Sequence, residues 1–216
     1  MFYTVKAPWI FKKLRPALMW QKPTKEKVLY LTFDDGPHPA ATPFVLDQLK
    51  QYNAKATFFC IGKNVVEQPA IYNRILEEGH RVGNHTFNHL NGWKTDNETY
   101  LNNVFEAAKY IDSNLFRPPY GRVTKFQEKI LCAQNNEIHN SKFRTSNFTI
   151  IMWTVLSGDF DVSLSAERCL QNVILNSKAG DIIVFHDSTK AWERMSYALP
   201  RMLEHFTKGG YRFEVL

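Results

Sequence analysis

The sequence predicts an α/β protein in which a parallel sheet is wrapped by helices. From Val28 to the C-terminus, short apolar runs alternate with segments whose apolar residues recur at helical spacing. The chain has 216 residues, 44% hydrophobic and 22% charged, which suits one globular domain with a sizeable core and excludes a disordered chain. Repeated strand–helix units in a chain of this length favour either a barrel or a doubly wound sheet.

The strands are expected where apolar runs end at polar or turn residues. The first, Val28 to Phe33, stops at the turn sequence Asp34-Asp35-Gly36-Pro37. A longer apolar run, Phe148 to Val155, predicts one buried strand in the second half of the chain. The remaining strands are expected at Lys55 to Ile61, Arg81 to Asn84, Phe116 to Arg117, Asp181 to Phe185 and Tyr211 to Val215.

The helices are expected between these strands, where apolar residues recur every three or four positions. The clearest case runs from Glu98 to Ile111, and Gly79 is expected to end the helix before the third strand. The polar stretch Asn135 to Asn147 predicts a surface loop. The other helices are expected at Thr42 to Tyr52, Val65 to Glu78, Thr124 to Ala133, Ser165 to Ser177 and Met195 to Phe206.

Residues 1–27 precede the repeated units and form an amphipathic extension, in which the apolar residues around Trp9 and Trp20 alternate with lysines. The stretch lacks the uninterrupted apolar core and small-residue cleavage site of a signal peptide. Pro8 and Pro16 leave little room for a long helix. We expect the extension to pack on or beside the domain formed by residues 28–216. Peripheral contact with a membrane surface is the alternative.

Net charge, apolar runs and cysteine content indicate which kinds of partner and which cellular location the chain suits. The net charge is +6, from 27 Lys and Arg against 21 Asp and Glu, but the basic residues are scattered, so nucleic acid is not favoured. No apolar run approaches the ~20 residues that span a bilayer. Cys60, Cys132 and Cys169 are odd in number and widely spaced, which predicts reduced, mostly buried thiols. Together these features favour a cytoplasmic or peripheral membrane location and give no oligomeric state.

Five polar clusters follow the predicted strands, and the carboxyl ends of the strands are where α/β proteins gather their active sites. Each cluster also has a purely structural interpretation. Asp-Asp-Gly is a common turn, Arg117 suits a loop brace, and a histidine that ends an apolar strand is more often a core residue. The clusters are Asp34-Asp35, His85 with His89, Arg117, Asp159, and His186-Asp187.

His85 and His89 are the most informative pair. Their i, i+4 spacing on a helical turn would place both imidazoles on one face, where they could share a metal ion; two unrelated surface histidines are the alternative. Zinc proteases use the same spacing but need Glu directly after the first histidine, and Thr86 stands there. A metalloprotease is therefore disfavoured.

In this order, the clusters resemble the motifs of the polysaccharide deacetylases, the carbohydrate esterase family four with its NodB-homology domain. The similarity extends over residues 28–216, which it identifies as the catalytic domain. The resemblance implies a distorted, incomplete (β/α) barrel and one divalent metal, most often zinc, with cobalt or nickel as alternatives. The matching motifs are Thr32-Phe33-Asp34-Asp35-Gly36, His85-Thr86-x-x-His89, Arg117-Pro118-Pro119-Tyr120-Gly121, Asp159-Phe160 and His186-Asp187.

The resemblance also implies a role for each residue. Asp35, His85 and His89 would hold the metal and leave a position for water. Asp34 would be the general base, with Arg117 keeping it oriented and ionised.

On the side of the leaving group, His186 would be the general acid, oriented by Asp159. The backbone N–H of Tyr120 would stabilise the oxyanion. Phe160 and Val184 would wall the pocket for the acetyl methyl group.

The fourth motif departs from the family pattern. Leu156 stands where the family often has Asp, and Phe160 where it often has Trp, although Asp161 could partly replace the missing carboxylate. The resemblance implies hydrolysis of N-acetyl groups in GlcNAc-containing glycans, either chitooligosaccharide or peptidoglycan, with release of acetate. The alternatives are an O-acetyl esterase of the xylan type, another C–N amide hydrolase on the same scaffold, and a glycan-binding relative without turnover.

Overall fold

The computed structural model describes residues 3–133 and 147–216, so the predicted loop at 135–147 lies outside the described residues except for its last position. The strands are β1 Val28–Asp34, β2 Ala56–Cys60, β3 Arg81–Asn84, β4 Leu115–Phe116, β5 Thr149–Ile150, β6 Val155–Leu156, β7 Ile182–His186 and β8 Arg212–Phe213. The α-helices are α1 Trp9–Leu14, α2 Ala41–Gln51, α3 Gly62–Glu67, α4 Pro69–Glu77, α5 Asn97–Ala107, α6 Lys125–Cys132, α7 Ala166–Ile174 and α8 Trp192–Lys208.

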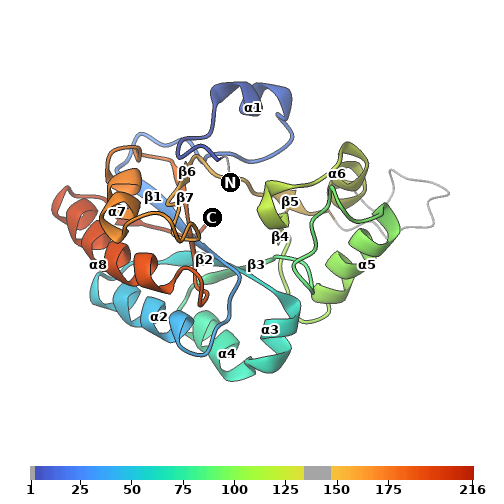
Figure 1. Ribbon diagram of the computed structural model, residues 1–216, viewed down its shortest axis with the longest axis horizontal. Coiled ribbons are helices and arrows are strands. Elements are labelled where there is room, and N and C mark those ends of the chain that lie inside the picture. Colours follow the sequence, from blue (N-terminus) through green and yellow to red (C-terminus); the bar gives the residue numbers. More distant parts are fainter. Residues whose placement is uncertain (1–2, 134–146) are drawn as a thin grey trace.

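The described strands form one sheet in the order β5-β4-β3-β2-β1-β7-β6, with β8 added beside the start of β1. The pairings between these strands are parallel. The sheet curls, and helices α2, α4, α7 and α8 cover its outer side (Figure 1). The chain is therefore an incomplete (β/α) barrel, as the resemblance implied.

Side chains alternate along each strand, so that one face of the sheet packs against the helices and the other lines the inner side of the curled sheet. On β1, Leu29, Leu31 and Phe33 belong to the main core beneath the helices. Tyr30 belongs to a second, inner cluster, and because side chains alternate along a strand, Asp34 points to this inner side as well. The register pairs Asp34 with His186 of β7, so one strand ladder brings two of the polar clusters side by side.

Two predicted elements are divided in the structure. The helix expected over residues 65–78 is two helices, α3 and α4, because Pro69 begins the second one and disfavours helical backbone at Gln68. The strand expected over residues 148–155 is the two short strands β5 and β6. Between them the carbonyls of Ile151 and Met152 accept hydrogen bonds from the buried Arg117 side chain, and this interrupts the run.

The extension before β1 makes isolated bridges on both sides of this interruption, and so reaches the strands at the two ends of the strand order. Lys6 pairs antiparallel with Val155 of β6, and Met19 pairs parallel with Ile151, next to β5. Leu18 is buried. Between these contacts α1 stands at the periphery of the molecule, on the other side from α3 and α4 (Figure 1). In the described part of the chain, no helix has the length and apolar character needed to cross a bilayer.

Candidate active site

The predicted polar clusters meet at the carboxyl ends of the strands. Asp34 ends β1, His85 directly follows β3, and Arg117 directly follows β4. His186 ends β7, and Asp159 lies three residues after β6. In each case a polar residue ends an apolar strand or follows it closely. Because the strands are parallel, their carboxyl ends lie at one edge of the sheet, and the polar residues gather there.

Asp35, His85 and His89 form the candidate metal centre. One ligand atom from each can be chosen so that all three lie within 4.8 Å of one another. The Oδ1 atom of Asp35 is 3.1 Å from Nε2 of His89 and 3.7 Å from Nε2 of His85. This Oδ1 is buried and accepts no hydrogen bond from the described residues. A buried carboxylate oxygen between two imidazole nitrogens suits a divalent cation of the zinc type.

The backbone at this centre differs from the expected helical turn. Residues 85–89 form an irregular loop rather than a helix, so the helical placement was wrong. Thr86, His89 and Asp35 have φ values of 64°, 58° and 81°, in the left-handed region that non-glycine residues rarely adopt. Residues held in this way at a polar cluster are typical of a functional site.

The hydrogen bond of His85 fixes its tautomer. Nδ1 lies 2.7 Å from the carbonyl oxygen of Arg117, so the proton sits on Nδ1 and the Nε2 lone pair faces Asp35. Burial lowers the pKa of His85 to about 4, which keeps the ring neutral at pH 7. A neutral imidazole with a free Nε2 is the form that binds a metal.

The side chain of Arg117 binds the carboxylate of Asp34. The buried guanidinium donates from Nη1 to Oδ1 of Asp34 and to Oγ1 of Thr32, both at 2.7 Å. Its face lies 4.1 Å from the ring centroid of Phe59. Arg117 is fully buried and Asp34 is nearly so, and a hydrogen bond between two such charged groups is shorter and stronger than one between neutral groups.

His186 is paired with Asp159. Nδ1 of His186 lies 2.8 Å from Oδ1 of Asp159, and the His186 N–H donates to Oδ2 at 2.6 Å. Burial alone would lower the pKa of His186, but the charges of Asp159, Asp35 and Asp34 outweigh it and raise the value to about 10. The imidazolium thus has its Nδ1–H committed to Asp159 and keeps an Nε2–H to donate.

The predicted substrate contacts surround these groups. Tyr120 is half exposed, and its ring centroid is 4.7 Å from that of His89. The ring of Phe160 meets His186 edge-on with centroids 5.3 Å apart. Val184 is buried on β7, where it shares the strand face of His186 and pairs with Leu156. Asp161 accepts hydrogen bonds from Ser163 and Tyr3, so its carboxylate is already engaged there.

Two further residues, Tyr3 and Asp187, contact the site although the sequence pattern predicts no role for either. Tyr3 packs edge-on against Phe160 with ring centroids 5.1 Å apart, which links the extension to the site. Asp187 was grouped with His186 but given no role. It is fully buried, accepts a hydrogen bond from Thr42, and lies so close to Gly36 that an added Cβ there would be 2.1 Å from Oδ2. Burial raises the pKa of Asp187 to about 8.

Comparisons with known proteins agree with this arrangement. The sequence model of the family described as Polysaccharide deacetylase matches residues 21–136. A peptidoglycan-N-acetylglucosamine deacetylase of Bacillus cereus is 34% identical over 210 residues, which cover 94% of this chain and 93% of the relative. A chitooligosaccharide deacetylase of Azorhizobium caulinodans is 32% identical, with 74% of this chain and 73% of that protein covered.

A similar solved structure is that of the Bc1960 peptidoglycan N-acetylglucosamine deacetylase in complex with 4-naphthalen-1-yl-N-oxidanyl-benzamide. The two chains share 32% sequence identity and superpose with a TM-score of 0.83. The alignment covers 97% of this chain and 95% of that one.

Proposed function

The chain belongs to the polysaccharide deacetylase family, and from this membership we propose that it hydrolyses the N-acetyl groups of GlcNAc residues in a glycan, with a divalent metal bound at Asp35, His85 and His89. Its named relatives are deacetylases of peptidoglycan N-acetylglucosamine and of chitooligosaccharide, which are hydrolases that act on C–N bonds. Zinc is the metal that we propose, since two imidazoles and one carboxylate are donors that it prefers.

The observation that carries the proposal is the pairing of Asp34 with His186 across β1 and β7, beside the candidate metal centre. One strand ladder thus sets a carboxylate that is paired with Arg117 next to an imidazolium that is paired with Asp159. A base and an acid with separate partners are what amide hydrolysis needs, because one proton leaves the water and another must reach the amine.

The base side of the reaction follows from Asp34. Its Oδ1 is bound by Arg117, which leaves Oδ2 to take a proton as a water oxygen bonds to the acetyl carbonyl carbon. A divalent metal, when bound, polarises that carbonyl and makes the water more acidic. The N–H of Tyr120, on the left-handed turn after Pro119, is our second proposed oxyanion donor.

The acid side follows from His186. As the C–N bond breaks, Nε2–H of the imidazolium gives its proton to the leaving nitrogen, and acetate and a free amine result. Asp159 holds Nδ1–H and so keeps the ring turned toward the leaving group. Phe160 and Val184 supply the apolar wall for the acetyl methyl.

Two exposed aromatic side chains are our proposed contacts for the sugar. Tyr120 and Trp93 expose their rings, and Trp93 follows His89 by four residues. The indole Nε1–H donates to the carbonyl of Val123 at 3.2 Å, and Arg122 lies over the same ring at 4.0 Å. Aromatic faces with a polar edge suit the mixed apolar and polar surface of a sugar.

Acetate release from GlcNAc oligomers and from peptidoglycan tests the proposal. The protein is stripped of metal and assayed with and without added zinc or cobalt. We expect metal-dependent acetate from at least one substrate, and no acetate from Asp34→Asn although it still binds zinc. Full activity of Asp34→Asn would contradict the base assignment. If zinc is bound and neither glycan releases acetate, the proposed substrate class would be contradicted.

A further inference from the structure

The helix α1 carries four large apolar side chains that remain exposed to solvent over much of their surface. Trp9, Ile10, Phe11 and Leu14 are 70%, 39%, 48% and 64% exposed, and no residue of the helix is buried. Single exposed apolar residues are normal on a protein surface. Four within six positions form a patch, and such patches mark contact with a partner or a membrane.

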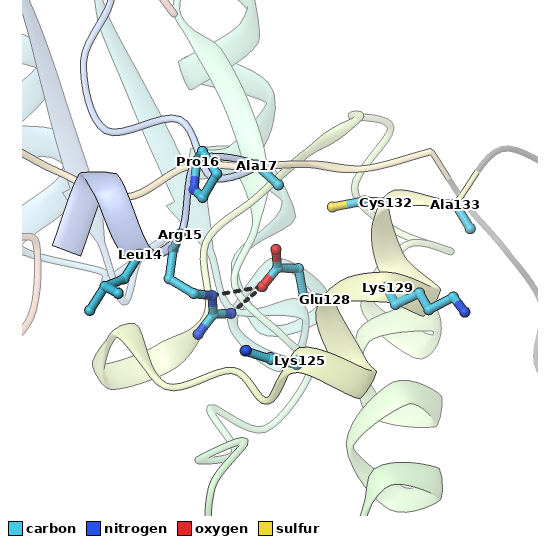
Figure 2. Close-up of a pocket in the computed structure, with 9 residues that line it drawn as sticks. All are labelled: Leu14, Arg15, Pro16, Ala17, Lys125, Glu128, Lys129, Cys132 and Ala133. Atoms are coloured by element: carbon cyan, nitrogen blue, oxygen red, sulfur yellow. Dashed lines mark hydrogen bonds and ion pairs between the residues drawn. The ribbon is translucent and has the colours of Figure 1, made fainter. Parts of the chain in front are cut away.

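The patch is displayed by a segment that is anchored at both ends. Before the helix, the Ala7 N–H donates to the carbonyl of Thr154 at 2.9 Å. After it, Arg15 Nε donates to Glu128 of α6 at 2.9 Å, and Leu18 is buried (Figure 2). The apolar side chains are thus held in place outside the core, although the flanking residues pack against the domain.

The charges around the patch are basic. Lys13 is exposed on α1, and the half-buried Lys12 beside it donates to Oε1 of Gln21 at 2.6 Å. Lys125 and Lys129 line a cavity of about 390 Å³ together with Leu14 (Figure 2). Of the described residues that line this cavity, the one carboxylate is Glu128, which is bound to Arg15. The surface that α1 presents therefore combines aromatic and aliphatic side chains with positive charge.

We propose that α1 docks the protein on a bilayer surface that contains anionic lipid. Aromatic and aliphatic side chains enter the interfacial region of a bilayer, while flanking lysines are attracted to acidic headgroups. A second copy of this chain is a poorer partner, because it would bring the same basic residues against each other.

Docking through α1 would also hold the candidate active site near the membrane. Tyr3 contacts Phe160 of the site and precedes Trp9 by six residues. Six residues span at most about 20 Å. The lipid surface would then lie within that distance of Tyr3.

Co-sedimentation of the full chain with vesicles tests the proposal. One set contains equal parts of phosphatidylglycerol and phosphatidylcholine, and the other contains phosphatidylcholine alone. We expect binding to the first set, weakened by salt because the lysine contribution is screened. Trp9→Ser combined with Leu14→Ser should lower the bound fraction about tenfold, and so should Lys12→Gln combined with Lys13→Gln on anionic vesicles.

Val66→Ser is the matched control, since Val66 is 48% exposed on α3, which lies on the other side of the molecule from α1 (Figure 1). It should bind as the parent does, and all variants should keep the parent's thermal midpoint. Three results would overturn the proposal: no sedimentation with anionic vesicles, an equal loss of binding in the Val66→Ser control, or dimerisation that depends on Trp9 and occurs without lipid. None of these readouts depends on deacetylation, so this test and that of the proposed function fail separately.

Discussion

Arg117→Met should destabilise the protein far more than the loss of one surface charge. The guanidinium is fully buried and donates to Asp34, to Thr32 and to the carbonyls of Ile151 and Met152. Its removal leaves the Asp34 carboxylate buried without its cation. Breaking a buried pair in this way costs about 3–5 kcal/mol in the free energy of unfolding.

Asp34→Asn should cost less, about 1–2 kcal/mol, because Arg117 keeps its other three acceptors. Adding Asp34→Asn to Arg117→Met should recover about 2 kcal/mol, since the double variant no longer buries an unpaired carboxylate.

Urea unfolding of the metal-free protein, followed by tryptophan fluorescence, measures these differences. Arg122→Met is the control, since Arg122 is half-buried and stacks on Trp93, and it should change the unfolding free energy by less than about 1 kcal/mol. A loss below about 1 kcal/mol for Arg117→Met, or strict additivity in the double variant, would refute the role given to this pair.

Three further predictions concern the fold around the site. His80 should lower the stability by up to about 3 kcal/mol as the pH drops from 6.5 to 4, because burial lowers its pKa from 6.5 to about 4 and the unfolded chain takes up the proton first. Burial lowers the pKa of His85 in the same way, so in the metal-free protein His80→Gln should reduce, but not abolish, the slope of that part of a urea-midpoint profile. Gly36→Ala should lower the thermal midpoint sharply, since its Cβ would collide with Asp187, whereas a small change would show that the loop yields. Ser165→Ala should cost about 1 kcal/mol in chemical unfolding, because Ser165 caps α7 by accepting from the Arg168 N–H, and an unchanged midpoint would refute the cap.

The positions of the site residues were predictable because they depend on strand ends. Asp34, His85, Arg117 and His186 each stop an apolar run or follow one directly, and parallel strands gather those stops at one end. The local conformation was not predictable in the same way. The i, i+4 spacing of His85 and His89 indicated a helical turn, whereas left-handed residues in an irregular loop bring the rings together.

For the strand predicted over residues 148–155, a long-range contact explains why the structure has two short strands instead of one. An apolar run such as residues 148–155 has no feature that marks its interruption, because the interruption comes from the Arg117 side chain, which is more than thirty positions away in the sequence. Asp187 is a similar case, since only the packed structure brings its carboxylate against Gly36. Local pattern predicts which segments are strands, but it does not predict which carbonyls a buried guanidinium will bind.

The incomplete barrel and the N-terminal extension depend on each other. A parallel sheet that does not close leaves strands with backbone groups to satisfy. The extension contacts the strands at the two ends of the strand order, through Lys6 beside β6 and Met19 beside β5. The two contacts lie thirteen positions apart, so the chain leaves the sheet after the first and returns to it at the second. The helix α1 lies in the segment between them. The same pairing carries Tyr3 to Phe160, so the segment that supports the edge of the sheet also packs against the wall of the candidate active site.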